Sequence, residues 1–297
     1  MYKTRSNRNL SVIVAVLVVI VLFFTGGCIK EDPCKTSTPF EFEESRGVAV
    51  DEEGNIYNVA YGKIQKFKKC NSVYVLLWEK NYMSDDVDVV IDKEYVWLVS
   101  RSHNAIGKFL TNGDFVSFSV NDIDSPTGID YKANYIYVTE FHNKVKKYDA
   151  KNGGDPILTI SLPPAPGYSP DVNPQDVAVD TTGNIYVLIA FLEPGPNEVF
   201  RVLKYDKEGT LVDEEFISDL IRSESIVVDS NDDIIVSDYS GRDSKVIDMI
   251  KKYSMKGELM ASYIVPEAEY ISGIAVDDSG EIYISDAYAK TIFSLER

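Results

Sequence analysis

One pattern recurs six times along the chain and constrains its fold more than any other feature. Each copy has a short apolar segment, usually ending in Asp, then a small polar turn and an alternating segment rich in Ile, Tyr and Val. The copies begin at residues 47, 88, 128, 176, 225 and 273, so the period is 40 to 49 residues. Each copy is followed by a third alternating segment, and most by a fourth. Four short β-runs per unit, joined by Gly, Asn and Asp turns, predict the blades of a β-propeller.

We therefore expect an all-β, six-bladed propeller over residues 38–297, with four antiparallel strands in each blade. Helical periodicity is nearly absent. The first segment of each copy is apolar on both faces, as an innermost strand between neighbouring blades should be. Solenoids and sandwiches are the competing folds, but a solenoid would normally show shorter, more uniform units and capping ends.

The two ends of the chain predict how the ring closes. The sixth copy stops after its third run, TIFSLE, and the alternating run PFEFEES precedes the first copy. An N-terminal strand at 38–44 would then join the last blade and remove the exposed edges. In that arrangement Cys34 stands at the start of the outer strand of the sixth blade and Cys70 ends the third strand of the first blade, both near the same face. A disulfide between them would lock the seam; two unrelated thiols are the alternative.

The first 27 residues predict export. Three basic residues precede an almost unbroken apolar run over 10–24, which is typical of a secretory signal peptide and short for a membrane-spanning helix. The run ends in TGGC, which resembles the lipobox of prokaryotic lipoproteins, although that motif usually has Leu where this chain has Thr25. The resemblance implies that Cys28 is lipidated and becomes the first mature residue.

Three segments are thus expected: a signal peptide at 1–27, a linker and anchor at 28–37, and the propeller. The lipidated Cys28 would hold the propeller on the outer face of a cell membrane. An uncleaved helical anchor or a plain signal peptide remain alternatives, and each of them also exports the remaining residues.

The charge of the chain excludes one class of partner. The formal net charge of −17 becomes about −20 without the basic N-terminal segment. Nucleic acids need Lys and Arg to neutralise their phosphates, so we expect no nucleic-acid partner. An acidic surface suits solubility, cationic partners or divalent ions.

The repeats also resemble a known family. The phrases GVAVDEEGNIY, PQDVAVDTTGNIYV and GIAVDDSGEIYISD are similar to the NHL-repeat motif, and similar blades cover 38–297. The resemblance implies a six-bladed propeller. Different relatives use it to bind protein, RNA or glycan and, in more distant cases, for metal-dependent lactone hydrolysis or lyase chemistry. It also implies a ligand face formed by the loops entering the innermost strands and the turns between second and third strands.

Aromatic residues recur in the turns of this expected face. Such a cluster could stack on sugar rings or anchor a protein partner, with ordinary loop packing as the alternative. The candidate ligand-face residues are Tyr61, Phe141, Phe191, Tyr239 and Tyr288.

Two further sets are candidate metal ligands. The chain's two histidines, His103 and His142, fall in turns of adjacent blades, but a catalytic metal site usually needs a third ligand. Asp88, Asp176 and Glu224 lie at or just before innermost strands, where carboxylates near the channel mouth could bind a hard cation. Turn-forming and repeat-typical roles are the competing interpretations. We expect no cofactor, with a divalent cation as the alternative.

Other aspartates are expected to be structural. Those that end the innermost strands should accept backbone N–H bonds from the adjoining turn: Asp51, Asp92, Asp180, Asp229 and Asp277. Asp130 instead falls inside its strand, where we expect it to be half-buried, to have a partner and to show a shifted pKa.

The leading hypothesis is a monomeric, lipid-anchored module that binds or scaffolds an extracellular protein or glycan through its loop face. Common hydrolase and nucleotide motifs such as GxSxG and the P-loop are missing from the sequence. The rival is a metal-dependent, lactonase-like or lyase-like enzyme with its site at the channel mouth. A structural role in an envelope assembly is a third possibility.

Overall fold

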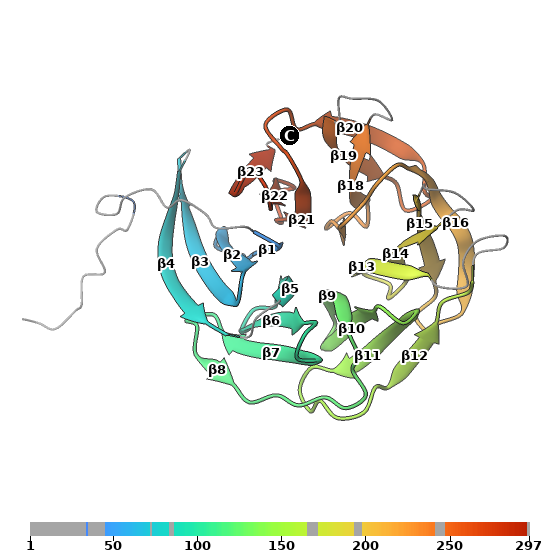
Figure 1. Cartoon of the computed structure of the whole chain (residues 1–297), viewed down its shortest axis with the longest axis horizontal. Coiled ribbons are helices and arrows are strands. Elements are labelled where there is room, and N and C mark those ends of the chain that lie inside the picture. Colours follow the sequence, from blue (N-terminus) through green and yellow to red (C-terminus); the bar gives the residue numbers. More distant parts are fainter. Residues whose placement is uncertain are drawn as a thin grey trace, which may run out of the picture. The chain divides into compact units, whose positions relative to one another are not determined.

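The computed structural model in Figure 1 is a six-bladed β-propeller, which confirms the predicted fold. It describes Cys34 and residues 45–295, apart from 72, 83–85, 165–171, 193–197 and 241–246. Six antiparallel sheets stand around a central channel in chain order, each with its first strand innermost (Figure 1). Within the described residues, we find no helix with the length and apolarity needed to span a bilayer.

The strands lie where the six repeats predict them. The first blade contains β1 (Gly47–Val50), β2 (Asn55–Ala60), β3 (Lys63–Cys70) and β4 (Val73–Asn81). The second contains β5 (Asp86–Ile91), β6 (Tyr95–Ser100), β7 (Ala105–Leu110) and β8 (Phe115–Val116). The third contains β9 (Pro126–Lys132), β10 (Tyr135–Glu140), β11 (Lys144–Asp149) and β12 (Leu158–Ser161). The fourth contains β13 (Asn173–Val179), β14 (Ile185–Leu192), β15 (Glu198–Tyr205) and β16 (Leu211–Leu220). The fifth contains β17 (Ile226–Val228), β18 (Ile234–Ser240), β19 (Ile247–Tyr253) and β20 (Leu259–Ile264). The sixth contains β21 (Ile271–Val276), β22 (Ile282–Asp286) and β23 (Thr291–Leu295).

The hydrophobic core lies between the blades. Trp97 and Val99 of β6 pack against Ile129 of β9 and Ile136 of β10, and similar clusters join the other neighbouring pairs. The inner strands are apolar on both faces because each meets a different blade on either side. Burial of this surface holds the ring together without a separate core for each blade.

The recurring aspartates are structural, as expected. Asp180 accepts backbone N–H bonds from Thr182 and Asn184, both at 2.9 Å, and a hydrogen bond from the hydroxyl of Tyr186 at 3.1 Å. The turns of the other strand ends repeat the backbone part of this pattern. Each carboxylate therefore fixes the turn between the first two strands of its blade.

The ring closes by packing the sixth blade against the first. Val48 of β1 and Phe67 of β3 share a hydrophobic cluster with Tyr283 of β22 and Ile292 of β23. The hydroxyl of Ser272 also donates a hydrogen bond to the Ser45 carbonyl, at 2.7 Å. The strand predicted at 38–44 lies outside the described residues.

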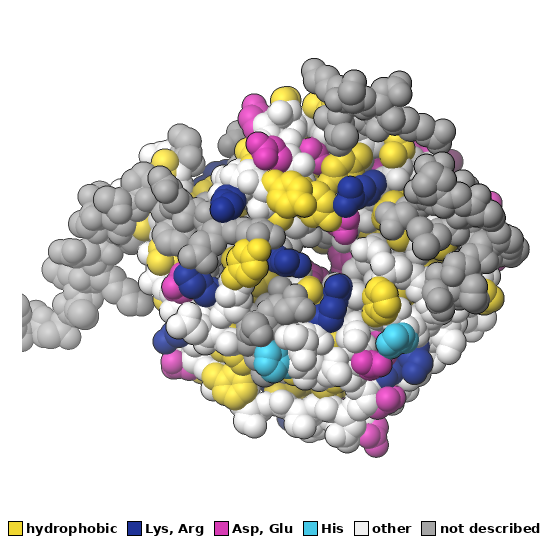
Figure 2. All heavy atoms as spheres, in the orientation of Figure 1, with side chains coloured by type: hydrophobic (Ala, Val, Ile, Leu, Met, Phe, Trp, Pro, Cys, Tyr) yellow, Lys and Arg dark blue, Asp and Glu magenta, His cyan; other side chains and the backbone are white. Residues whose placement is uncertain are grey.

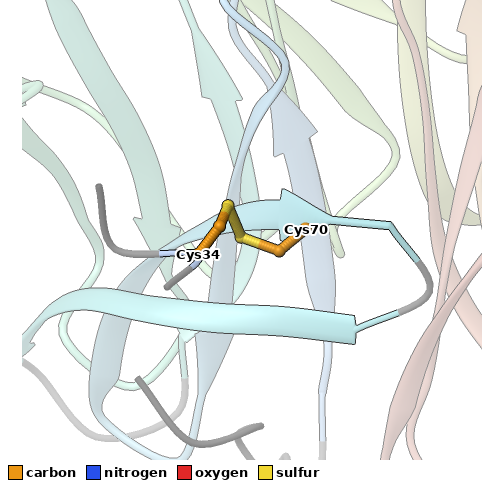
Figure 3. The surroundings of a disulfide bond; sticks show 2 residues. All are labelled: Cys34 and Cys70. Carbon is orange, nitrogen blue, oxygen red and sulfur yellow. A yellow bond between two sulfur atoms is a disulfide. The ribbon is translucent and has the colours of Figure 1, made fainter. Parts of the chain in front are cut away.

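A disulfide joins Cys34 to Cys70, the last residue of β3 (Figure 3). The two Cα atoms are 5.5 Å apart. This is the pair that the sequence suggested, and it fixes a point of the N-terminal segment to the first blade.

Candidate ligand face

The predicted metal candidates Asp88 and Asp176 line the channel wall, each directly after a residue that lines the channel mouth, Val87 and Gln175. Asp88 Oδ2 accepts a hydrogen bond from the N–H of Ile129 in the next blade (3.0 Å). Asp176 Oδ2 accepts one from the N–H of Ile226, also in the next blade (2.9 Å). The other oxygen of each carboxyl accepts the N–H of the residue that follows it. Both side chains thus link neighbouring blades.

Burial raises the pKa of these channel carboxyls. It raises the pKa of Asp176 to about 6 and that of Asp88 well above its ordinary value, with a further rise for Asp88 from the charge of Asp176. Asp130 behaves as expected, since it accepts N–H bonds from Tyr131 and from Val179 of the next blade, both at 2.7 Å. Its burial raises its pKa to about 7.

The histidines do not converge on a common point. His103 Nδ1 lies 3.2 Å from Ser100 Oγ and 3.0 Å from Ser102 Oγ, whereas His142 Nε2 lies 3.6 Å from Asp124 Oδ2. Within the part of the chain that the structure describes, no group of three or more His, Cys, Asp or Glu side chains could hold a metal ion.

The five aromatic residues of the predicted ligand face differ in exposure. Tyr61, Phe141 and Tyr288 are 61%, 47% and 63% exposed. Phe191 and Tyr239, in contrast, are 2% and 5% exposed, so neither can form an open surface. Both lie within regular strands, β14 and β18, where the pleat directs them inward; Phe191 belongs to a core cluster between blades.

A pocket of about 220 Å³ opens at the channel mouth on this face. We call it the mouth pocket, and its main polar and aromatic side chains are Arg46, Arg101, Gln175, Glu224, Tyr270 and Tyr288. Gln175 belongs to the innermost strand β13. The others come from loops that enter innermost strands and from turns between second and third strands, which is where the ligand face was expected. Of these residues, only Glu224 and Tyr288 were predicted candidates.

A single buried carboxylate positions the two tyrosines. Asp286, at the end of β22, accepts backbone N–H bonds from Glu269 and Tyr270 on one loop (2.7 and 2.9 Å). It accepts two more from Tyr288 and Ala289 on the next turn (2.9 and 2.6 Å). The two aromatic rings consequently lie side by side, with centroids 5.0 Å apart.

Arg222 lies behind this side of the pocket, in contact with the lining residues Glu224 and Tyr270. The guanidinium of Arg222 lies over the rings of Tyr239 and Tyr270, at 5.5 and 5.2 Å from their centroids. Its Nε is 3.5 Å from Glu224 Oε1, which also accepts a 2.7 Å hydrogen bond from the Tyr270 hydroxyl. The charge of Glu224 is therefore offset within the framework of the pocket.

Three polar atoms close to this framework are buried without a hydrogen-bond partner among the described residues: the Ser223 hydroxyl, the Tyr239 hydroxyl and Asp248 Oδ1. Tyr239 and Asp248 are cross-strand neighbours in β18 and β19. Burial raises the pKa of Asp248, and the charge of Asp286 raises it further. Buried polar groups without partners are uncommon and point to a functional or strained position.

The mouth of the channel carries cationic side chains although the chain is strongly acidic. Figure 2 shows Lys and Arg side chains around the central opening, together with apolar side chains and the two histidines. Arg46 and Arg101 line the pocket, and Glu224 faces Arg222. A local cationic field at a concave site favours anionic ligands.

Comparison with known proteins supports the fold alone. No family model matches the chain, and no curated protein matches it. Among solved structures it is similar to hydrazine synthase from Kuenenia stuttgartiensis, with a TM-score of 0.64, 10% identity, and 91% of this chain and 99% of that chain covered. It is also similar to virginiamycin B lyase from Staphylococcus aureus (TM-score 0.56, 13% identity, 88% of each chain). A catalytically inactive histidine-to-alanine variant of that lyase with quinupristin matches equally well (TM-score 0.56, 14% identity, 87% of this chain and 97% of that chain).

Proposed function

We propose that this chain is an exported, NHL-like propeller that binds a glycan in its mouth pocket. The observation that carries the proposal is the concave pocket itself, in which two adjacent tyrosines and several charged side chains meet. Aromatic rings pack well against the apolar faces of sugars. A pocket of about 220 Å³ suits a small group, whereas a protein partner would normally need a larger and flatter area.

A lyase-like enzyme is the alternative, favoured by the fold shared with virginiamycin B lyase. In that lyase a histidine-to-alanine variant is inactive. Here both histidines stand in the β6–β7 and β10–β11 turns, and neither lines the mouth pocket. The binding proposal needs no such residue, which is why we prefer it.

Export and lipidation at Cys28 are part of the proposal. They are supported by the signal-like N-terminal segment and by the disulfide, since disulfides persist in oxidising compartments. Expression of the wild type and of Cys28→Ala in a lipoprotein-processing bacterium tests this. We expect wild-type chain in the membrane fraction and a change in processing for the variant. Equal processing and fractionation of the two would contradict lipidation.

Binding is tested by screening the full chain against an array of glycans. We expect binding that Tyr288→Ala removes, because this exposed ring lines the pocket. Phe141→Ala is the matched control, since Phe141 is also exposed but does not line the pocket. Capture of a protein and of no glycan, unaffected by Tyr288→Ala, would contradict the proposal.

A further inference from the structure

We infer that the mouth pocket takes an anionic sugar, whose ring packs on Tyr288 and whose acid group meets Arg101 and Arg46. The inference rests on the proposed function and adds the charge of the ligand. The ligands that fit this description are sugars that carry a carboxylate or sulfate group on the ring.

Arg101 is the first part of the argument. It follows β6 directly, it is exposed, and it lines the pocket. Among the described residues, no carboxylate forms an ion pair with its guanidinium. An arginine that lines a concave site without a protein anion has its forked donors available for a planar or tetrahedral anion.

Arg46 provides a second cation at the same opening. It immediately precedes β1, and its guanidinium lies 5.9 Å from the centroid of the Tyr61 ring. This stacking directs the side chain along the loop face. Two arginines from adjacent blades thus line one pocket of about 220 Å³.

Among the described residues that line the pocket, Glu224 is the one anionic side chain. Glu224 lies 3.5 Å from Arg222 and accepts the Tyr270 hydroxyl, so its charge is already offset. The described lining residues thus include two cationic side chains and one anionic side chain, on a chain whose net charge is −17. A neutral sugar would gain no electrostatic attraction from these arginines. An acidic sugar would be attracted by them, although the rest of the acidic surface repels it.

The remaining side chains suit the sugar ring. Tyr288 is 63% exposed and is fixed through its backbone by Asp286, so an open aromatic surface stands at the edge of the pocket. Gln175 and Thr127 line the same pocket and offer donors and acceptors for hydroxyl groups. The ligand would stack on one side and pair its acid group on the other.

Sugars that differ only at C6 test the inference. Glucuronate, glucose 6-sulfate and glucose, with the matching galactose series, are titrated into the full chain and followed by NMR. We expect at least one acidic member to bind roughly tenfold more tightly than its neutral parent, since charge-assisted hydrogen bonds are about twice as strong as neutral ones. Added salt should weaken the acidic ligand alone. The carboxylate and sulfate arms identify which acid group is preferred.

Two variants separate the charge from the stacking. Arg101→Gln should remove most of the preference for the acid while binding of the neutral sugar remains. Lys93→Gln is the matched control, because Lys93 is an exposed cation on the opposite face, paired with Glu52. Tyr288→Ala should weaken binding of acidic and neutral sugars alike.

The outcomes distinguish the two proposals. Equal binding of acidic and neutral sugars, with loss in Tyr288→Ala, would overturn this inference and leave glycan binding standing. An unchanged preference in Arg101→Gln would also overturn it. Absence of binding for every sugar, with the folded state verified by the NMR spectrum, would overturn the proposed function itself.

Discussion

Side-chain carboxyl groups hold two different places in the innermost strands. At the strand ends they accept N–H bonds within one turn, as Asp180 does. On the channel wall, Asp88, Asp130 and Asp176 each accept an N–H from the neighbouring blade, and burial raises the pKa of all three. The first kind shapes a hairpin, and, against the effect of burial, the hydrogen bonds of its turn lower the pKa of Asp180. The second kind connects blades.

Asp130→Asn should flatten the pH dependence of stability. Burial raises the folded-state pKa of Asp130 to about 7, above its value of roughly 4 in the unfolded chain. The folded state therefore holds the proton more tightly, so the stability from this group is present below pH 4 and is lost as the pH rises through 7. Between pH 5 and 8 the free energy of unfolding should fall by on the order of 2 kcal/mol more in the wild type than in the variant. Urea unfolding at both pH values measures this; parallel losses in the two proteins would contradict it.

Tyr239→Phe should leave stability unchanged or raise it by up to about 1 kcal/mol, because the buried hydroxyl has no hydrogen-bond partner among the described residues. Tyr186→Phe is the matched control. Its hydroxyl donates to Asp180 at 3.1 Å in an equally buried place, and its loss should cost roughly 1–2 kcal/mol. Denaturant unfolding compares the two. A clear loss in Tyr239→Phe would show that its hydroxyl is bonded after all.

At the scale of the element, glycines in two innermost strands lie against the aspartates of the neighbouring innermost strands. A Cβ at Gly47 would come within 2.9 Å of Asp88 Oδ1, and one at Gly128 would overlap the Asp176 carboxyl. These glycines leave space for the carboxyl of the next blade. The small residue and the aspartate are thus two parts of one contact between adjacent strands.

Gly128→Ala should destabilise the propeller by roughly 1–3 kcal/mol, the usual cost of overpacking a tight site. Asp176→Ala would remove the carboxyl oxygen that the new methyl meets, although the Asp176 Cα, 2.7 Å from that methyl, would remain. In a double-mutant cycle, the combined variant should therefore lose less than the two single variants together. Thermal or urea unfolding gives the four values. If the losses of the two single variants simply add up in the double variant, Gly128 is not there to make room for the Asp176 carboxyl.

The sequence predicts the strands well because each has the same neighbours as its counterpart in the next blade. It predicts the site less well. The turns around Phe191 and Tyr239 look open in sequence, yet the strands extend through both residues and bury them. Arg101 and Arg46 stand in loops with no repeated pattern, so no periodicity marks them. The positions of Asp88 and Asp176 in the sequence also do not predict that each carboxylate accepts an N–H bond from the next blade.

At the scale of the whole molecule, the stability of a ring depends on the contact between its first and last blades. That contact joins β1 and β3 to β22 and β23, residues far apart in sequence. The Cys34–Cys70 disulfide, the only covalent cross-link that the described residues contain, lies on the first blade beside this seam. The disulfide should therefore change the stability of the whole propeller, which unfolds as one cooperative unit.

Cys34→Ala/Cys70→Ala should lower the free energy of unfolding by roughly 2–4 kcal/mol. The bridge closes a loop with a sequence separation of 36, and its removal frees that loop in the unfolded chain. Reduction of the wild type should produce a similar loss, whereas the same reductant should leave the double variant unaffected. Urea unfolding with and without reductant measures both effects, with thiol labelling to verify the redox state. If the reduced wild type unfolds at the same urea concentration as the oxidised protein, the bridge does not stabilise the propeller, and the non-covalent contact between the sixth and first blades suffices to close it.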